Sequence, residues 1–77
     1  MFDSLTKQQR AINNALKTRV SRDIRESLMH QNAMIDCIIH LRDANALNDN
    51  AQSFVTNMID DFRDSMRDDF NFDITKY

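Results

Sequence analysis

The fold is indicated most clearly by residues 51–70, which read AQSFVTNMIDDFRDSMRDDF. Apolar residues recur there every three or four positions, as they do along one face of an α-helix. These residues are Ala51, Phe54, Val55, Met58, Ile59, Phe62, Met66 and Phe70. The opposite face carries Asp60, Asp61, Asp64 and Asp68. Arg63 and Arg67 follow two of these aspartates at i,i+3, where ion pairs with Asp60 and Asp64 are expected. The spacing predicts an amphipathic helix over 51–70.

Residues 45–50, which read NALNDN, predict the turn before this helix. Asparagine and aspartate tolerate the left-handed backbone that often ends a helix, and they also cap helix N-termini. Because the chain has no glycine, these residues are expected to do both jobs.

The most apolar stretch precedes that turn and predicts a helix over residues 21–46. A helix that is apolar over most of its circumference has to be covered on more than one side. One neighbour from the same chain hardly suffices, so we expect this helix to pair two copies of the chain. The expected self-association residues are Ile24, Leu28, Met34, Ile35, Ile38, Ile39 and Leu41.

A further helix is predicted over residues 4–19, with Leu5, Ile12 and Leu16 on one face. The apolar face rotates by about a quarter turn between Leu16 and the next segment, counting about 100° per residue. This drift predicts a break with Ser21 as the helix cap, although one long bent helix remains an alternative.

Composition supports an all-helical fold. The 77 residues include no glycine and no proline, where average usage predicts about nine of the two together. The lack of glycine excludes Gly-rich phosphate loops and the nucleophile elbow of hydrolases. We predict one all-α domain over residues 1–77, a two- or three-helix hairpin or bundle, paired into a homodimeric bundle.

The expected location is the cytoplasm, with no membrane span. No run approaches the roughly 18–20 apolar residues of a transmembrane helix. Residues 1–4 lack the basic and then apolar pattern of a secretory leader. The single cysteine, Cys37, excludes an intramolecular disulfide and a Cys-rich zinc site.

Catalysis and metal binding find little support in the pattern. His30, Cys37 and His40 share one helical region, but a zinc site would need a further ligand from elsewhere. A Cys–His nucleophile pair would need an orienting group and an oxyanion hole. We therefore expect no enzyme activity, no metal and no cofactor.

Charge is divided unevenly between the two parts of the chain. Residues 1–26 carry a net charge of +3, and residues 27–77 carry −5. Separate basic and acidic surfaces are the expected result. One alternative function is therefore a small nucleic-acid-binding regulator that contacts phosphates. Its contact residues would be Lys7, Arg10, Lys17, Arg22 and Arg25.

Two other surfaces are candidates for binding a protein partner. The aspartates of residues 60–68 are either a solvated face or an imitation of DNA phosphates. The tail, residues 71–77, contains Phe72, Ile74 and Tyr77, which either fold back over the bundle or hook into a partner.

These observations favour a non-catalytic interaction module that regulates or inhibits a larger protein. In size, glycine-free helicity and aspartate-rich charge, the chain resembles the small accessory proteins that phages make to block host machinery. That group includes anti-CRISPR proteins and lysis regulators. The resemblance implies a protein target.

Overall fold

Three helices and one short 3-10 turn form the structure, a computed structural model that describes residues 3–77. The elements are α1 (Asp3–Leu16), α2 (Arg22–Asp43), α3 (Ala51–Phe70) and η1 (Ile74–Lys76). No strand occurs among the described residues, and the all-α prediction is confirmed. Met1 and Phe2, part of the segment considered above for a leader, lie outside the described residues.

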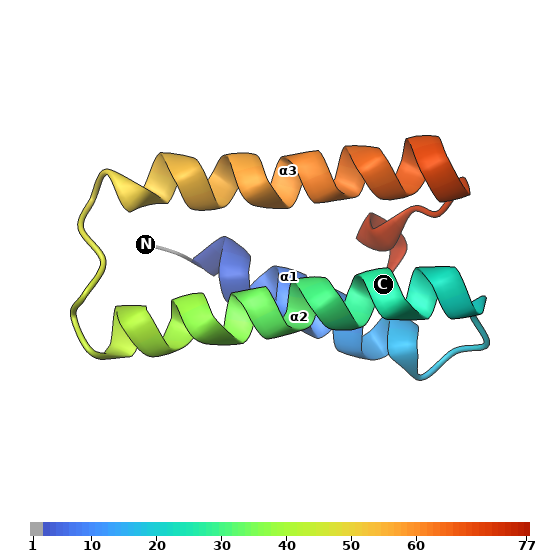
Figure 1. The fold of residues 1–77 in the computed structure, drawn as a ribbon, viewed down its shortest axis with the longest axis horizontal. Coiled ribbons are helices and arrows are strands. Elements are labelled where there is room, and N and C mark those ends of the chain that lie inside the picture. The colour runs from blue at the N-terminus through green and yellow to red at the C-terminus, as the bar shows by residue number, and fades with distance from the viewer. Residues whose placement is uncertain (1–2) are drawn as a thin grey trace.

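The helices form an elongated bundle that measures 36 × 21 × 18 Å. Helices α2 and α3 run antiparallel, and α1 crosses behind them (Figure 1). The most extensive contacts join α1 to α2, whereas α2 and α3 contact each other least. One consequence is that α1 holds the bundle together from one side.

The core is aliphatic and draws on every element. Its buried members are Leu5, Ile12 and Ala15 of α1, Leu28 and Ile35 of α2, Val55, Ile59 and Met66 of α3, and Ile74 of η1. Burial of each large aliphatic side chain contributes about 1.5–3 kcal/mol. The four elements therefore share a single contiguous core.

The first two helices are separate, which settles the alternative that the sequence left open. Helix α1 ends at Leu16, three residues before the predicted end at residue 19. The reason is local: the Thr18 hydroxyl donates to the Ala15 carbonyl at 2.6 Å, and the Thr18 N–H donates to the same oxygen. Ser21 then caps α2 by accepting a hydrogen bond from the Ile24 N–H at 3.3 Å, as predicted.

Helix α2 ends at Asp43, three residues before the predicted end at residue 46. Asn45 adopts a left-handed conformation with φ of 59°, and the Ala46 N–H bonds to the Leu41 carbonyl at 2.8 Å. This is the hydrogen bond of a Schellman C-cap. The expected left-handed asparagine is thus present, and it stops the helix earlier than predicted.

Helix α3 has the predicted bounds, Ala51–Phe70. At its start the Asn48 side chain accepts from the Ala51 N–H at 3.1 Å, while the Asn50 side chain makes no capping bond. At its end Asn71 is left-handed with φ of 53°, and this residue turns the chain back toward the bundle.

The tail folds back onto the bundle, which is one of its two predicted arrangements. Ile74 is buried, and η1 packs against α1 and α3. The Phe72 and Tyr77 rings stack with their centroids 5.3 Å apart. The Asn14 side-chain amide donates to the Tyr77 carbonyl oxygen at 3.5 Å, which joins the tail to α1.

Candidate protein-binding groove

A groove of about 640 Å³ lies between α2 and α3 and is lined by these two helices alone. Its walls are Asp23, Glu26, Ser27 and His30 of α2, and Phe62, Ser65, Met66 and Phe70 of α3. Since α1 contributes none of these residues, the groove opens on the face that α1 leaves uncovered.

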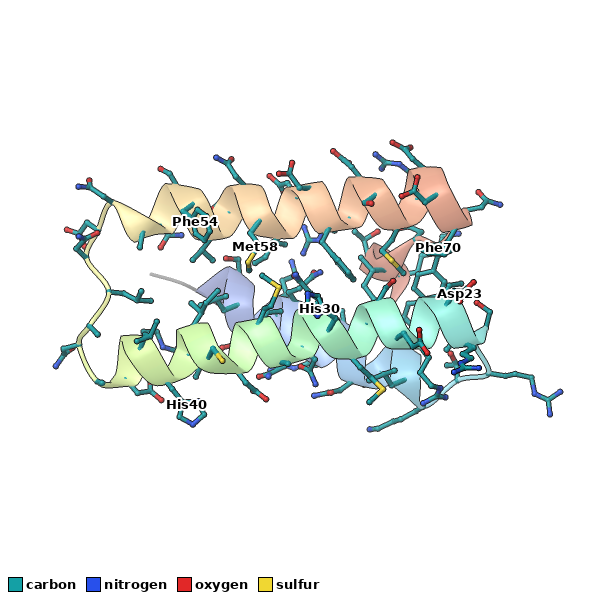
Figure 2. The ribbon with its side chains drawn as sticks, in the orientation of Figure 1. Asp23, His30, His40, Phe54, Met58 and Phe70 are labelled. Atoms are coloured by element: carbon teal, nitrogen blue, oxygen red, sulfur yellow. The ribbon has the colours of Figure 1, made fainter. Side chains whose placement is uncertain are left out.

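Large exposed apolar side chains continue this surface toward the other end of the two helices. On α2, Met34 and Leu41 follow His30 at helical spacing and are 38% and 46% exposed. On α3, Phe54 is 67% exposed, and Met58 is half-buried one turn further on. Figure 2 shows Phe54 and Met58 extending from α3 toward α2, with Phe70 at the opposite end near Asp23. We call this whole surface the α2–α3 groove.

The predicted self-association residues divide into three groups. Leu28 and Ile35 have no exposed surface, because they belong to the core of their own chain. Ile24, Ile38 and Ile39 are half-buried against that core. Met34 and Leu41 alone among the seven are exposed, and they follow the groove residue His30 at helical spacing on α2. Helices α1 and α3 therefore supply much of the cover that the prediction assigned to a second copy.

Carboxylates border one end of the groove. Asp23 and Glu26 line it directly, and the Ser65 hydroxyl in its wall donates to Asp69 at 3.1 Å. No lysine or arginine is among the groove-lining residues named above. Glu26 forms a largely exposed ion pair with Arg22 at 3.1 Å. This end of the groove therefore presents negative charge around an apolar floor.

A buried polar contact lies between α1 and α3. Arg63 donates from Nε to the Gln8 side-chain oxygen at 3.1 Å, and Gln8 is fully buried. The predicted ion pair of Arg63 with Asp60 is therefore wrong, because the guanidinium faces α1 and not along its own helix. The other predicted pair is confirmed: Arg67 contacts Asp64 at 2.7 Å.

The acidic face of α3 is exposed along its length, with Asp60, Asp61, Asp64 and Asp68 all on the surface. Because Arg63 faces Gln8, this face keeps more of its negative charge than the sequence suggests. The aspartates are exposed carboxylates outside the apolar walls of the groove.

The three predicted tail residues have different exposures. Ile74 is buried and offers no surface to a partner, Phe72 is half-buried, and Tyr77 is 40% exposed. Beside them, the Thr75 hydroxyl and N–H both donate to the Asp73 carboxylate. These two hydrogen bonds lower the pKa of Asp73 below its ordinary value, with smaller contributions from Lys76 and Arg67.

The basic residues proposed for phosphate contacts are all exposed: Lys7, Arg10, Lys17, Arg22 and Arg25. Two of them have partners on the protein itself. Arg22 pairs with Glu26, and Arg25 donates to the Leu16 carbonyl at 3.5 Å. The α1 residues face solvent on the side of that helix opposite the buried Ile12.

The residues considered for metal or nucleophile chemistry do not converge. Cys37 is an exposed free thiol, and His40 lies with Nδ1 2.7 Å from the Asp36 carbonyl oxygen. His30 points toward α3, whereas His40 points away from it (Figure 2). Within residues 3–77, no three His, Cys, Asp or Glu side chains are grouped to hold a metal ion.

The α3 wall of the groove was not among the predicted binding residues, since its apolar residues were interpreted only as one face of an amphipathic helix. A signal was present: the apolar arc of this helix spans about 160° from Phe54 to Phe70, at roughly 100° per residue. An arc of that width exceeds what packing against one neighbour needs.

Two further findings bear on the class of protein. Of the helices described, none has the length and apolar character needed to cross a membrane. Comparison of the chain with protein-family models, curated proteins and solved structures finds no match.

Proposed function

We propose that this protein is a non-catalytic interaction module that regulates or inhibits a larger protein by binding it in the α2–α3 groove. The observation that carries the proposal is the groove of about 640 Å³ lined by Phe62, Met66 and Phe70 of α3. Met34, Leu41 and Phe54 are exposed further along the same two helices. Contiguous exposed apolar surface is uncommon on monomeric proteins and marks interaction sites. Grooves of this kind accept the apolar face of a helix from another protein.

The shape of the bundle supports this proposal. Helices α2 and α3 contact each other less than either contacts α1, and α1 contributes no residue to the groove between them. A helix laid in that groove would contact both walls and complete a four-helix arrangement. Phe54 and Phe70 are exposed, and aromatic side chains of this type dominate the binding energy at protein interfaces.

Two predictions from the sequence stay predictions. The homodimer would use the same groove, and a second copy would then compete with the target. Nucleic-acid binding would use Lys7 and Arg10 on α1, Lys17 just after it, and Arg22 and Arg25 at the start of α2. Neither prediction is supported by an observation as specific as the open groove.

Site-specific photocrosslinking in the organism of origin tests the proposal. A photoreactive benzoyl-phenylalanine replaces Phe54 on the α3 side of the groove, or Lys7 on α1 as the control at another exposed helix position. The expected result is a discrete protein adduct from position 54 that is absent from position 7. The same adduct should be lost when Met34→Asp is added to the opposite wall of the groove.

Three results would overturn the proposal. Equal adducts from both positions would show no preference for the groove. No adduct at position 54 would leave the groove without a partner. An adduct of two copies of this chain would show that the groove serves self-association instead of a target.

A further inference from the structure

We infer that the occupant of the α2–α3 groove is a cationic amphipathic helix, with its lysines or arginines nearest the end marked by Asp23 and Phe70. The inference rests on the proposed function and specifies the chemistry of the partner. It follows from three features of the groove: its length, its lining and its charge.

The length of the groove matches a helix of ordinary size. On α2 its wall runs from Asp23 to Leu41, which is about 27 Å at 1.5 Å per residue. A partner helix of about 18 residues would span it. On α3 the facing wall runs from Phe54 to Phe70, so both walls extend over a similar distance.

The lining suits an apolar helix face of variable shape. Phe62 and Phe70 line the groove on α3. Met34 on α2, and Phe54 and Met58 on α3, lie further along the same helix faces at helical spacing. Methionine adapts to irregular surfaces and is typical of grooves that bind amphipathic helices. Phe54 and Met58 extend toward α2 (Figure 2), where a helix in the groove would meet them.

The negative charge at the Phe70 end of the groove favours a partner that carries positive charge. Asp23 and Glu26 line the groove, and Asp69 is held at its edge by the Ser65 hydroxyl. Arg22 offsets Glu26 in part, but this exposed pair is weak and easily exchanged for another cation. Basic side chains flanking the apolar stripe of a partner would complement these carboxylates.

A second copy of this chain complements the groove less well. Two grooves placed face to face would each bring an apolar floor and carboxylates, without lysine or arginine on the groove walls. Like charges across an interface disfavour association. A cationic helix supplies the positive charge that the walls of both grooves lack.

Model peptides test the inference with the intact protein. The probe is an 18-residue Leu/Lys peptide with helical amphipathic spacing, and its matched control replaces every Lys with Glu. Amide and methyl NMR shifts report binding residue by residue. We expect the Leu/Lys peptide to shift groove residues such as Met34 and Phe54, and to bind at least about tenfold more tightly than the Leu/Glu peptide. Added salt should reduce that preference.

Paired charge variants show which carboxylates cause the preference for the Leu/Lys peptide. Asp23→Asn with Glu26→Gln removes two carboxylates from the groove, and should weaken Leu/Lys binding at least about threefold. Asp60→Asn with Asp68→Asn removes the same charge from the outer face of α3, and should change the affinity less than twofold by comparison. All four positions are exposed, so the variants are expected to fold.

The outcomes separate this inference from the function on which it rests. Equal binding of the Leu/Lys and Leu/Glu peptides in the groove would overturn the cationic partner and leave the proposed function standing. Shifts confined to the acidic face of α3, equal loss in both double variants, or no peptide binding would also overturn the inference. The photocrosslinking experiment at position 54 decides the proposed function independently.

Discussion

Gln8 and Gln31 are buried glutamines in a core that is otherwise built from aliphatic side chains and one methionine. Gln8 uses its side-chain oxygen to accept from Arg63 at 3.1 Å, and this contact fixes the level at which α1 meets α3. Among the described residues, the Gln8 amide nitrogen and the Gln31 side-chain oxygen have no hydrogen-bond partner. Within residues 3–77, Arg63 is therefore the one group that hydrogen-bonds to the buried Gln8 side chain.

Replacing Arg63 tests this contact. Arg63→Ala leaves the Gln8 oxygen buried without a donor, a loss that costs about 1–3 kcal/mol of unfolding free energy. Arg67→Ala is the matched control, because it removes an exposed pair worth about 0–1 kcal/mol. Urea denaturation of both variants measures the difference. Equal destabilisation by the two substitutions would show that the Arg63–Gln8 contact contributes no more to stability than the exposed Arg67–Asp64 pair.

Asp73 provides a pH-dependent prediction. Because the Thr75 hydroxyl and N–H stabilise the ionised carboxylate, the pKa of Asp73 in the folded protein lies below its ordinary value of 3.8. This contribution to stability is present above the ordinary pKa and is lost as the pH falls through the folded value.

A carboxyl-carbon NMR titration of Asp73 measures this effect directly. The midpoint in the native protein should lie below 3.8, and Thr75→Ala should raise it by removing the hydroxyl hydrogen bond. A midpoint at or above 3.8 in the native protein, or no change in the variant, would contradict the assignment.

At the level of elements, asparagine takes the role that glycine plays at the helix ends of most proteins. Asn45 after α2 and Asn71 after α3 both have positive φ. Each is followed by a residue whose N–H bonds back to the end of the helix: Ala46 bonds to Leu41, and Phe72 bonds to Met66. The first is the hydrogen bond of a Schellman motif, and the second reaches one residue further back along its helix.

The end of α3 gives a prediction at this scale. Asn71→Ala places a Cβ-bearing residue without a compensating polar group in the left-handed region, at a cost of about 1–2 kcal/mol. Asn71→Gly should instead stabilise the protein or leave it unchanged. Asn50→Ala is the control, since Asn50 has an ordinary helical backbone and no side-chain capping bond. Thermal unfolding of the three variants should rank Asn71→Ala lowest, and any other order contradicts this account of the helix end.

At the level of the whole molecule, the helices and their ends follow from periodicity and capping chemistry. The bounds of α3, the Ser21 cap and the left-handed Asn45 all rest on interactions within a few residues, which a sequence displays. Such local patterns place each apolar face relative to its own helix axis.

The α2–α3 groove depends on how the helices are rotated about one another, which local patterns do not fix. Leu28 and Met34 belong to the same apolar pattern, yet one lies in the core and the other on the groove. Arg63 shows the same limit: the i,i+3 rule pairs it with Asp60, whereas packing against α1 gives it Gln8. Only the tertiary arrangement distinguishes a core position from a binding position.

The central claim is that the groove is unoccupied in the free protein and binds a different protein. Light scattering across a dilution series tests it most directly, with Phe54→Asp measured alongside. The account predicts the mass of one chain, 9.1 kDa, at every concentration and for both proteins. A doubled mass that persists on dilution, and that Phe54→Asp returns to one chain, would contradict it by showing that a second copy fills the groove.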